Sequence, residues 1–210
     1  MFVTNEWYIF YEALSKKTCN KIKRLAKNTW IESHVDTQKE TLEEERKTGR
    51  KGDYKPDPRL RKSDLHWTTE QWLYDLIWPF MQEANEQAGW CFDISTAESM
   101  QITRYGKGGF YSFHRDGMGD HLSAYKLPDN SFLHGRVRKL SMTVLLNEDY
   151  EGGAFEFATY SKEECGISTP EFSKAGSVIV FPSGMEHRVA PVTKGIRYSL
   201  VTWFLGPPFV

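Results

Sequence analysis

The chain has 210 residues, of which 40% are hydrophobic and 14% aromatic, a composition typical of a globular protein with one sizeable core. Its 27 basic and 28 acidic residues leave a net charge of −1, which provides no positive field to hold a nucleic acid, and no run approaches the roughly 20 apolar residues of a membrane span. Since no secretory signal is readable and the three cysteines (Cys19, Cys91, Cys165) are scattered, we expect a soluble, cytoplasmic protein with reduced thiols and neither nucleic-acid nor membrane partners.

The chain opens with a short apolar segment, Trp7 to Phe10, which predicts a strand. The residues that follow repeat Leu and Ile at helical spacing, and Ser15 is suited to cap the start of that helix. We expect this helix to flank a sheet.

Charged residues dominate the stretch from about Asp36 to Asp64, which contains Gly and Pro but almost no large apolar side chain. Such a segment buries little surface, so we expect it to be mobile. Two interpretations stay open, a solvated loop and a lid or substrate-binding loop.

Residues 68–89 return to helical periodicity, with Thr68 or Thr69 as the expected cap and Pro79 as the expected kink or break. Their Trp and Leu stripe is interpreted as core.

After Trp90 the chain turns to short segments rich in β-branched and aromatic residues, separated by glycine turns such as Gly108–Gly109 and Gly152–Gly153. No helical pattern intervenes, which favours a sandwich or jelly roll over a parallel βαβ sheet. The expected strands lie in MQITRY, GGFYSFH, KLSMTVLLN, GGAFEF, GSVIVF and RYSLVTWFL.

Two residues that could bind one metal ion lie on the second of these segments. His114 and Asp116 are two positions apart, so in an extended strand both side chains project from the same face. A second histidine, His187, lies in a β-rich segment downstream. Two imidazoles and one carboxylate leave the remaining metal positions open, as in non-haem Fe(II) oxygenases. The other four histidines (His34, His66, His121, His134) are left unassigned.

Arg197 stands ten residues after His187, at the start of the last expected strand. A guanidinium has the planar fork that binds a carboxylate through two hydrogen bonds, so Arg197 is a candidate anchor for the distal carboxylate of 2-oxoglutarate.

The C-terminal half, about residues 100–207, resembles the prolyl 4-hydroxylase type of 2-oxoglutarate/Fe(II) oxygenases, and HRVAPVTKGIRYSLVTWF is similar to their bacterial PKHD-type branch. YGKGGFYSFHRD resembles the strand entering the metal site, LLNEDYEGGAFEF the hairpin after it, and GSVIVFPSGMEHRV the strand with the distal histidine. The resemblance implies a mainly β, cupin-like double-stranded β-helix with N-terminal flanking helices. We expect one domain, 1–210, in which 1–95 support a catalytic core at 96–207.

The resemblance also implies roles for individual residues. His114, Asp116 and His187 match the iron ligands, and Arg197 matches the residue that binds the 2-oxoglutarate tail, although many prolyl hydroxylases carry Lys there. Tyr105 matches a tyrosine that hydrogen-bonds 2-oxoglutarate. Two further aromatic residues, Tyr111 and Trp203, match positions that line a prolyl pocket, and packing within the core is an equal alternative for them.

The implied activity is hydroxylation of a C–H bond with Fe(II), 2-oxoglutarate and O2, releasing succinate and CO2, and ascorbate binding is a further expectation. A prolyl residue in a peptide or protein is the favoured substrate. The alternatives are a free amino acid or other small molecule, a non-catalytic metal-binding β-helix module, and a cupin-like metal enzyme independent of 2-oxoglutarate.

Overall fold

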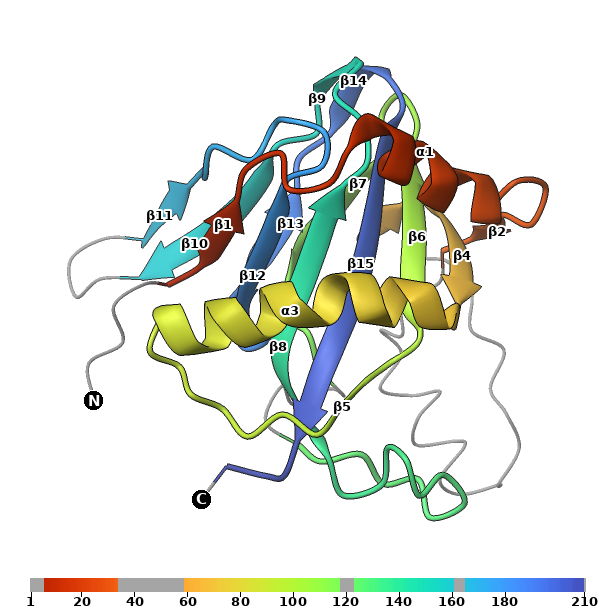
Figure 1. Cartoon of the computed structure of the whole chain (residues 1–210). Coiled ribbons are helices and arrows are strands. Elements are labelled where there is room, and N and C mark those ends of the chain that lie inside the picture. The colour runs from red at the N-terminus through yellow and green to blue at the C-terminus, as the bar shows by residue number, and fades with distance from the viewer. Residues whose placement is uncertain (1–5, 34–58, 118–122, 161–164, 210) are drawn as a thin grey trace.

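The computed structural model describes residues 6–33, 59–117, 123–160 and 165–209 (Figure 1). Antiparallel strands dominate these ranges and form two main sheets. Along the second half the chain passes repeatedly from one sheet to the other, which confirms the expected jelly roll. No helix in the described ranges is long and apolar enough to cross a membrane.

The larger sheet has eight strands in the order β1-β12-β8-β15-β6-β4-β2, with β5 paired to β15. In chain order they are β1 (Tyr8–Phe10), β2 (Ile31–Glu32), β4 (Asp64–Thr68), β5 (Thr96–Ala97), β6 (Met100–Tyr105), β8 (Val137–Leu145), β12 (Val178–Pro182) and β15 (Arg197–Gly206).

The smaller sheet has five strands in the order β11-β10-β13-β7-β3, and two further strands, β9 and β14, form a separate pair. These strands are β3 (Arg61–Lys62), β7 (Phe110–His114), β9 (Tyr150–Gly152), β10 (Phe155–Tyr160), β11 (Cys165–Ser168), β13 (His187–Val189) and β14 (Val192–Gly195).

Two helices, α1 (Lys16–Leu25) and α3 (Gln71–Gln87), cover the outer face of the larger sheet, and Figure 1 shows α3 crossing it. Ser15 caps α1 as expected, because its Oγ accepts a hydrogen bond from the Thr18 amide. The expected cap of α3 is wrong: Thr68 ends β4, and Glu70 stands at the cap position without a side-chain hydrogen bond. Pro79 does not break α3, which continues to Gln87.

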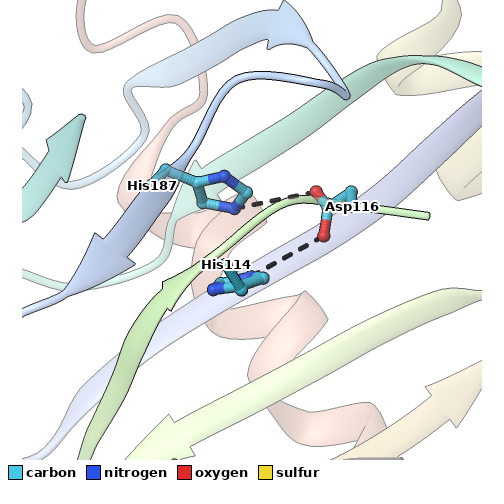
Figure 2. A group of neighbouring side chains, drawn as sticks. All are labelled: His114, Asp116 and His187. Atoms are coloured by element: carbon cyan, nitrogen blue, oxygen red, sulfur yellow. Dashed lines mark ion pairs between the residues drawn. The ribbon is translucent and has the colours of Figure 1, made fainter. Parts of the chain in front are cut away.

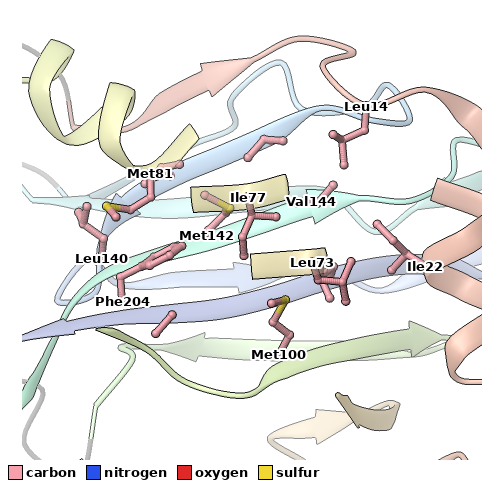
Figure 3. Packing of buried hydrophobic residues seen from close by; sticks show 14 of the residues in the cluster. Leu14, Ile22, Leu73, Ile77, Met81, Met100, Leu140, Met142, Val144 and Phe204 are labelled. Atoms are coloured by element: carbon pink, nitrogen blue, oxygen red, sulfur yellow. The ribbon is translucent and has the colours of Figure 1, made fainter. Parts of the chain in front are cut away.

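Apolar side chains fill both interfaces of this layered arrangement. Between the helices and the larger sheet, residues of α3 such as Leu73 and Ile77 meet Met142 of β8 and Phe204 of β15 (Figure 3). Between the two sheets lies a second cluster, in which Phe155, Phe157 and Phe181 contact one another edge to face or tilted. Each fully buried side chain of this kind contributes about 1.5–3 kcal/mol, so the inner cluster gives the sheets a stable, closely packed interface.

Three expectations about individual segments are corrected. LLNEDYEGGAFEF does not form a hairpin, since β9 pairs with β14 while β10 pairs with β11 and β13. GSVIVFPSGMEHRV is not one strand, because β12 and β13 belong to different sheets. Of the expected mobile segment 36–64, residues 36–58 lie outside the described ranges, but its end is ordered in β3 and at the start of β4, and Arg61 and Ser63 are buried there.

Candidate metal centre

The three expected ligands come together at the pairing of β7 with β13. His114 ends β7, His187 begins β13, and the two residues are direct partners in the antiparallel register. Asp116 follows two residues after His114, and its carboxylate faces both rings from one side (Figure 2). The sequence placed the first pair on one extended strand, whereas β7 ends at His114 and Asp116 lies in the bend beyond it, still facing His114. The pairing of strands far apart in the chain supplies the third ligand.

The distances between these side chains leave space for an ion. His114 Nε2 lies 3.7 Å from Asp116 Oδ1, and His187 Nε2 lies 3.7 Å from Asp116 Oδ2. Both separations are too long for hydrogen bonds. All three ligand atoms lie within 4.8 Å of one another, so a single metal ion could contact each of them.

Backbone carbonyl groups set the tautomer of both histidines. Nδ1 of His114 lies 2.8 Å from the Ser112 carbonyl oxygen, and Nδ1 of His187 lies 2.9 Å from that of Met185. A carbonyl oxygen only accepts, so each Nδ1 carries the hydrogen and donates it. Each Nε2 therefore directs a free lone pair toward Asp116, which is the orientation that a metal ligand requires.

The electrostatic environment keeps the site in its metal-binding protonation state. Burial, followed by the neighbouring His187, lowers the pKa of His114 from 6.5 to about 3. Burial opposes ionisation of Asp116, but its interactions with His187 and His114, the Arg138 charge and the hydrogen bond from Ser141 together outweigh burial and lower the pKa of its carboxyl group. Neutral imidazole and ionised carboxylate are the forms that bind metals.

Asp116 is also fixed by two serines. Ser141 of β8 donates from Oγ to Asp116 Oδ2 at 2.7 Å, and the Ser183 hydroxyl lies 2.9 Å from that of Ser141. The Asp116 amide donates to the Ser183 carbonyl oxygen at 3.0 Å. Both serines are completely buried, so the carboxylate has little rotational freedom.

Arg197 is a buried cation with unused donors. Only 1% of its surface is exposed, and its Nη1 donates a hydrogen bond to Ser199 Oγ at 3.2 Å. Its Nε and Nη2 are buried without any partner in the described residues. Buried polar groups normally have partners, so this arrangement is that of a binding site for an anion.

The aromatic residues singled out from the sequence lie around these groups. Tyr105 pairs with Arg197 in the register of β6 and β15, and its ring centre lies 5.6 Å from the guanidinium. Tyr111 stacks on the His114 ring at 3.5 Å, and burial is the main cause that raises the pKa of its hydroxyl to about 12. Trp203 is buried, and its Nε1 has no partner among the described residues.

Two arginines near the site were missed by the sequence reasoning. Arg138 forms a two-pronged ion pair with Glu98, at 2.7 Å for each contact, and lies 4.1 Å from the centre of the Trp203 ring. Arg61 lies 4.5 Å from the ring centre of Tyr111. Neither residue has a spacing that marks it, since Arg138 stands beside another basic residue, Lys139, in β8, and Arg61 belongs to the charged stretch. Only the strand pairing reveals them.

A separate cavity of about 880 Å³ lies on the other side of the larger sheet, between α3, residues 96–99 and residues 130–133. Tyr74, Trp78 and Phe132 supply its aromatic walls. None of the three metal-site residues lines it, so the chemistry described above belongs to the interior between the sheets.

Comparisons with known proteins agree with this geometry. Residues 100–205 match the model of the 2OG-Fe(II) oxygenase superfamily. A PKHD-type hydroxylase of Xylella fastidiosa strain M12 is 38% identical over 106 residues, which are 49% of this chain and 42% of that protein. A PKHD-type hydroxylase of a Picosynechococcus species is 34% identical over 110 residues, 51% of this chain and 42% of that protein. The match thus spans about two-fifths of the length of these relatives.

Solved structures share the fold along nearly the whole chain. A Pseudomonas putida prolyl-4-hydroxylase superposes with a TM-score of 0.60 and 19% identity, covering 96% of this chain and 92% of the other. A Trichoplax adhaerens prolyl hydroxylase, solved in complex with a peptide fragment of the hypoxia inducible factor oxygen degradation domain, gives 0.65 and 15%, covering 96% and 84%. At these identities the likeness shows the fold alone.

Proposed function

Since this chain belongs to the 2OG-Fe(II) oxygenase superfamily, we propose that it is an Fe(II)- and 2-oxoglutarate-dependent dioxygenase that hydroxylates a C–H bond. The observation that carries the proposal is the combination of a three-ligand metal set on the smaller sheet with a buried guanidinium on β15 of the larger sheet, whose Nε and Nη2 have no partner in the described residues. The first suits a metal that keeps open positions, and the second suits the tail of a dicarboxylate.

The residues present fit both groups. His114, Asp116 and His187 would hold Fe(II) through two Nε2 lone pairs and a carboxylate. Arg197 would receive the distal carboxylate of 2-oxoglutarate through Nε and Nη2, the donors that lack a partner, and the Tyr105 hydroxyl would bind the same molecule. Once bound, iron and 2-oxoglutarate together supply the oxidation in which O2 gives one oxygen atom to the substrate and one to succinate, with loss of CO2.

The chain itself contributes position and exclusion of water. The Phe155, Phe157 and Phe181 rings surround His187 and close one side of the centre to solvent. Ser141 and the two carbonyl groups fix the orientation of the three ligands. These contacts keep the reacting groups in one geometry through the turnover.

For the substrate, we favour a prolyl residue in a peptide or protein. Tyr111 is half-buried and stacks on the metal ligand His114, and the buried Trp203 pairs in the sheet with Ser141, which holds Asp116; both rings are suited to contact the faces of a pyrrolidine ring. The named relatives and the Trichoplax adhaerens structure with its peptide support this choice.

The activity is tested by incubating the purified chain with Fe(II), 2-oxoglutarate and either proline-containing peptides or free amino acids. We expect succinate release matched by a gain of about 16 Da in the peptide, as one oxygen atom requires. Asp116→Asn is the inactive control. Parallel reactions with and without ascorbate check the expectation that ascorbate takes part.

Different results point to different alternatives. Product from free amino acids alone would replace the peptide with a small-molecule substrate. Absence of both succinate release and O2 consumption with every compound would contradict the activity and favour a non-catalytic metal-binding module.

A further inference from the structure

Arg61 is a second buried cation at the metal centre that the proposed chemistry leaves unused. The register of β3 and β7 places it directly opposite Tyr111. The Tyr111 ring contacts both the Arg61 guanidinium, at 4.5 Å, and the His114 ring, at 3.5 Å. Arg61 and the metal ligand His114 thus share one aromatic neighbour.

The hydrogen-bond partners of Arg61 are all uncharged. Its Nε donates to Ser63 Oγ at 2.8 Å, and its Nη2 donates to Gln101 Oε1 at 2.9 Å. Within the described ranges no carboxylate forms an ion pair with it, although only 8% of its surface is exposed. A charge this deeply buried without an acidic partner is costly, which suggests that a ligand completes the site.

The three arginines of the interior differ in how they are satisfied. Arg138 is neutralised by the Glu98 carboxylate. Arg197 has no contact with solvent through Nε and Nη2, which are both buried and unpaired, as suits the inner end of a small co-substrate. Arg61 has no hydrogen bond from Nη1 among the described residues, and Nη1 is not one of the fully buried atoms that lack a partner, so this atom is accessible to solvent. An open donor is positioned to meet a molecule that enters from outside.

Charge balance points to the kind of molecule. The two carboxylates of 2-oxoglutarate and that of Asp116 are balanced by the iron dication and Arg197, and Arg138 is balanced by Glu98. The positive charge of Arg61 has no such counter-charge. An arginine that stacks on an aromatic ring directs its N–H groups outward in the plane of the guanidinium, so the N–H groups that remain free suit a carboxylate.

We propose that Arg61 recognises a carboxylate of the substrate, so that this chain acts on an anionic substrate in preference to a neutral one. This inference rests on the proposed function and narrows its substrate class. The carboxylate could belong to an acidic residue beside the target in a peptide or to a free amino acid, and both present the same group to the guanidinium.

Binding to matched probes tests the inference without requiring turnover. The probes are blocked proline-containing pentapeptides with Glu or Gln at each position flanking the proline, together with L-proline and L-prolinamide. Their affinities are measured by titration calorimetry in the absence of O2, with Mn(II) and 2-oxoglutarate present. We expect the intact chain to bind the anionic member of at least one pair about ten-fold more tightly, the effect of one charge-assisted hydrogen-bonded contact.

Three variants identify the residue responsible. Arg61→Gln should lose most of the preference, and Arg61→Lys should keep part of it, because it retains the charge without the fork. Lys62→Gln is the matched control: it removes the same charge from the adjacent, exposed position of β3, and it should behave as the intact chain. Circular dichroism checks that each variant is folded.

The outcomes separate this inference from the proposed function. Preference for a Glu peptide identifies a peptide carboxylate, and preference for L-proline over L-prolinamide a free amino acid. Equal affinity of the intact chain, within about two-fold, for both members of every pair would overturn the inference. An equal loss of affinity for the anionic and the neutral probe in Arg61→Gln would also overturn it, because a structural arginine would give that result. Succinate release is measured separately, so an inactive protein with the charge preference would contradict only the proposed function.

Discussion

At the scale of single residues, the metal centre depends on groups that never touch the metal. Asp116 Oδ2 accepts a hydrogen bond from Ser141, and it faces His187 at the same time. The serine therefore holds Oδ2 of the carboxylate in place and leaves Oδ1, which faces His114, without this hydrogen bond.

Replacing Ser141 should weaken metal binding without unfolding the protein. Ser141→Ala removes the hydrogen bond to Asp116, and loss of such an outer contact typically raises the metal Kd by roughly 10- to 100-fold. Titration with Mn(II) measures the change. Thr143→Ala, at another buried position of β8, serves as the control and should leave the Kd unchanged. Equal values for Ser141→Ala and the intact chain would show that Asp116 needs no support.

Arg197 should govern the affinity for 2-oxoglutarate. Truncating one partner of a buried charge pair costs about 2–5 kcal/mol, so Arg197→Gln should raise the KM for 2-oxoglutarate by at least about 30-fold. Arg197→Lys should fall between the two, since it keeps the charge and loses the fork. The Mn(II) Kd is the internal control. An unchanged KM in Arg197→Gln would instead favour a cupin-like enzyme independent of 2-oxoglutarate.

The low pKa of His114 should make the metal-free protein sensitive to acid. Its pKa falls from 6.5 to about 3 on folding, mainly through burial. Between these values the unfolded chain binds a proton that the folded chain does not, so stability decreases as the pH falls through this range. From pH 6.5 to pH 5 the loss is about 2 kcal/mol, at 1.36 kcal/mol for each pKa unit.

Urea unfolding at pH 7 and pH 5 measures this loss. His114→Gln should reduce the difference between the two pH values, whereas His66→Gln, at a histidine away from the centre, should not. The pKa of Asp116 is lowered below 3.8, so its contribution is lost only under more acidic conditions and does not obscure the test. A pH dependence that is unchanged in His114→Gln would contradict the buried, neutral form of this residue.

At the scale of elements, the sequence predicted strands best where β-branched and aromatic residues gather between turns. MQITRY corresponds residue for residue to β6, and RYSLVTWFL lies within β15. Both strands are buried on their two faces, so their composition identifies them without a regular alternation of polar and apolar residues.

The elements that were missed depend on partners far away in the chain. β3 has two charged residues and no apolar pattern, and it forms because β7 offers it hydrogen bonds. Arg61 could not be predicted as a site residue for the same reason, because only the pairing of β3 with β7 brings it to the site. The break between β12 and β13 could not be predicted either, because it depends on a turn that carries His187 from one sheet to the other. Tertiary pairing, rather than local propensity, decides these positions.

The tight turn before β10 should control the position of Arg197. Gly153 has a φ of 64°, and a Cβ there would lie 3.0 Å from Arg197 Cδ and from Val192 Cγ2. Gly153→Ala should therefore lose about 1–2 kcal/mol of stability through backbone strain and also raise the KM for 2-oxoglutarate.

Gly135 offers a matched control for this substitution. It has a φ of 77°, and a Cβ there meets nothing within 4 Å. Gly135→Ala should show the loss of stability alone, measured by urea unfolding, with the KM unchanged. The expectation for Gly153 would fail if both variants altered the KM equally, because the effect would then not arise from contact with Arg197.

At the scale of the whole molecule, the centre joins the two sheets. His114 and His187 come from the smaller sheet, whereas Arg197 and the Ser141 that holds Asp116 come from the larger one. Metal and co-substrate would therefore connect both layers, and their binding energy should appear as global stability.

Thermal unfolding in the presence of Mn(II) and 2-oxoglutarate should reveal this connection. Mn(II) at about 100 times its Kd adds about 2.7 kcal/mol, which for a chain of this size raises the Tm by roughly 5–10 °C. Asp116→Asn should show little of this increase. Adding 2-oxoglutarate to the metal-loaded chain should raise the Tm further. In Arg197→Gln, Mn(II) should still raise the Tm, whereas 2-oxoglutarate should add no further increase. If 2-oxoglutarate stabilised Arg197→Gln as much as the intact chain, the larger sheet would not provide the anchor, and the two layers would not be joined through the co-substrate.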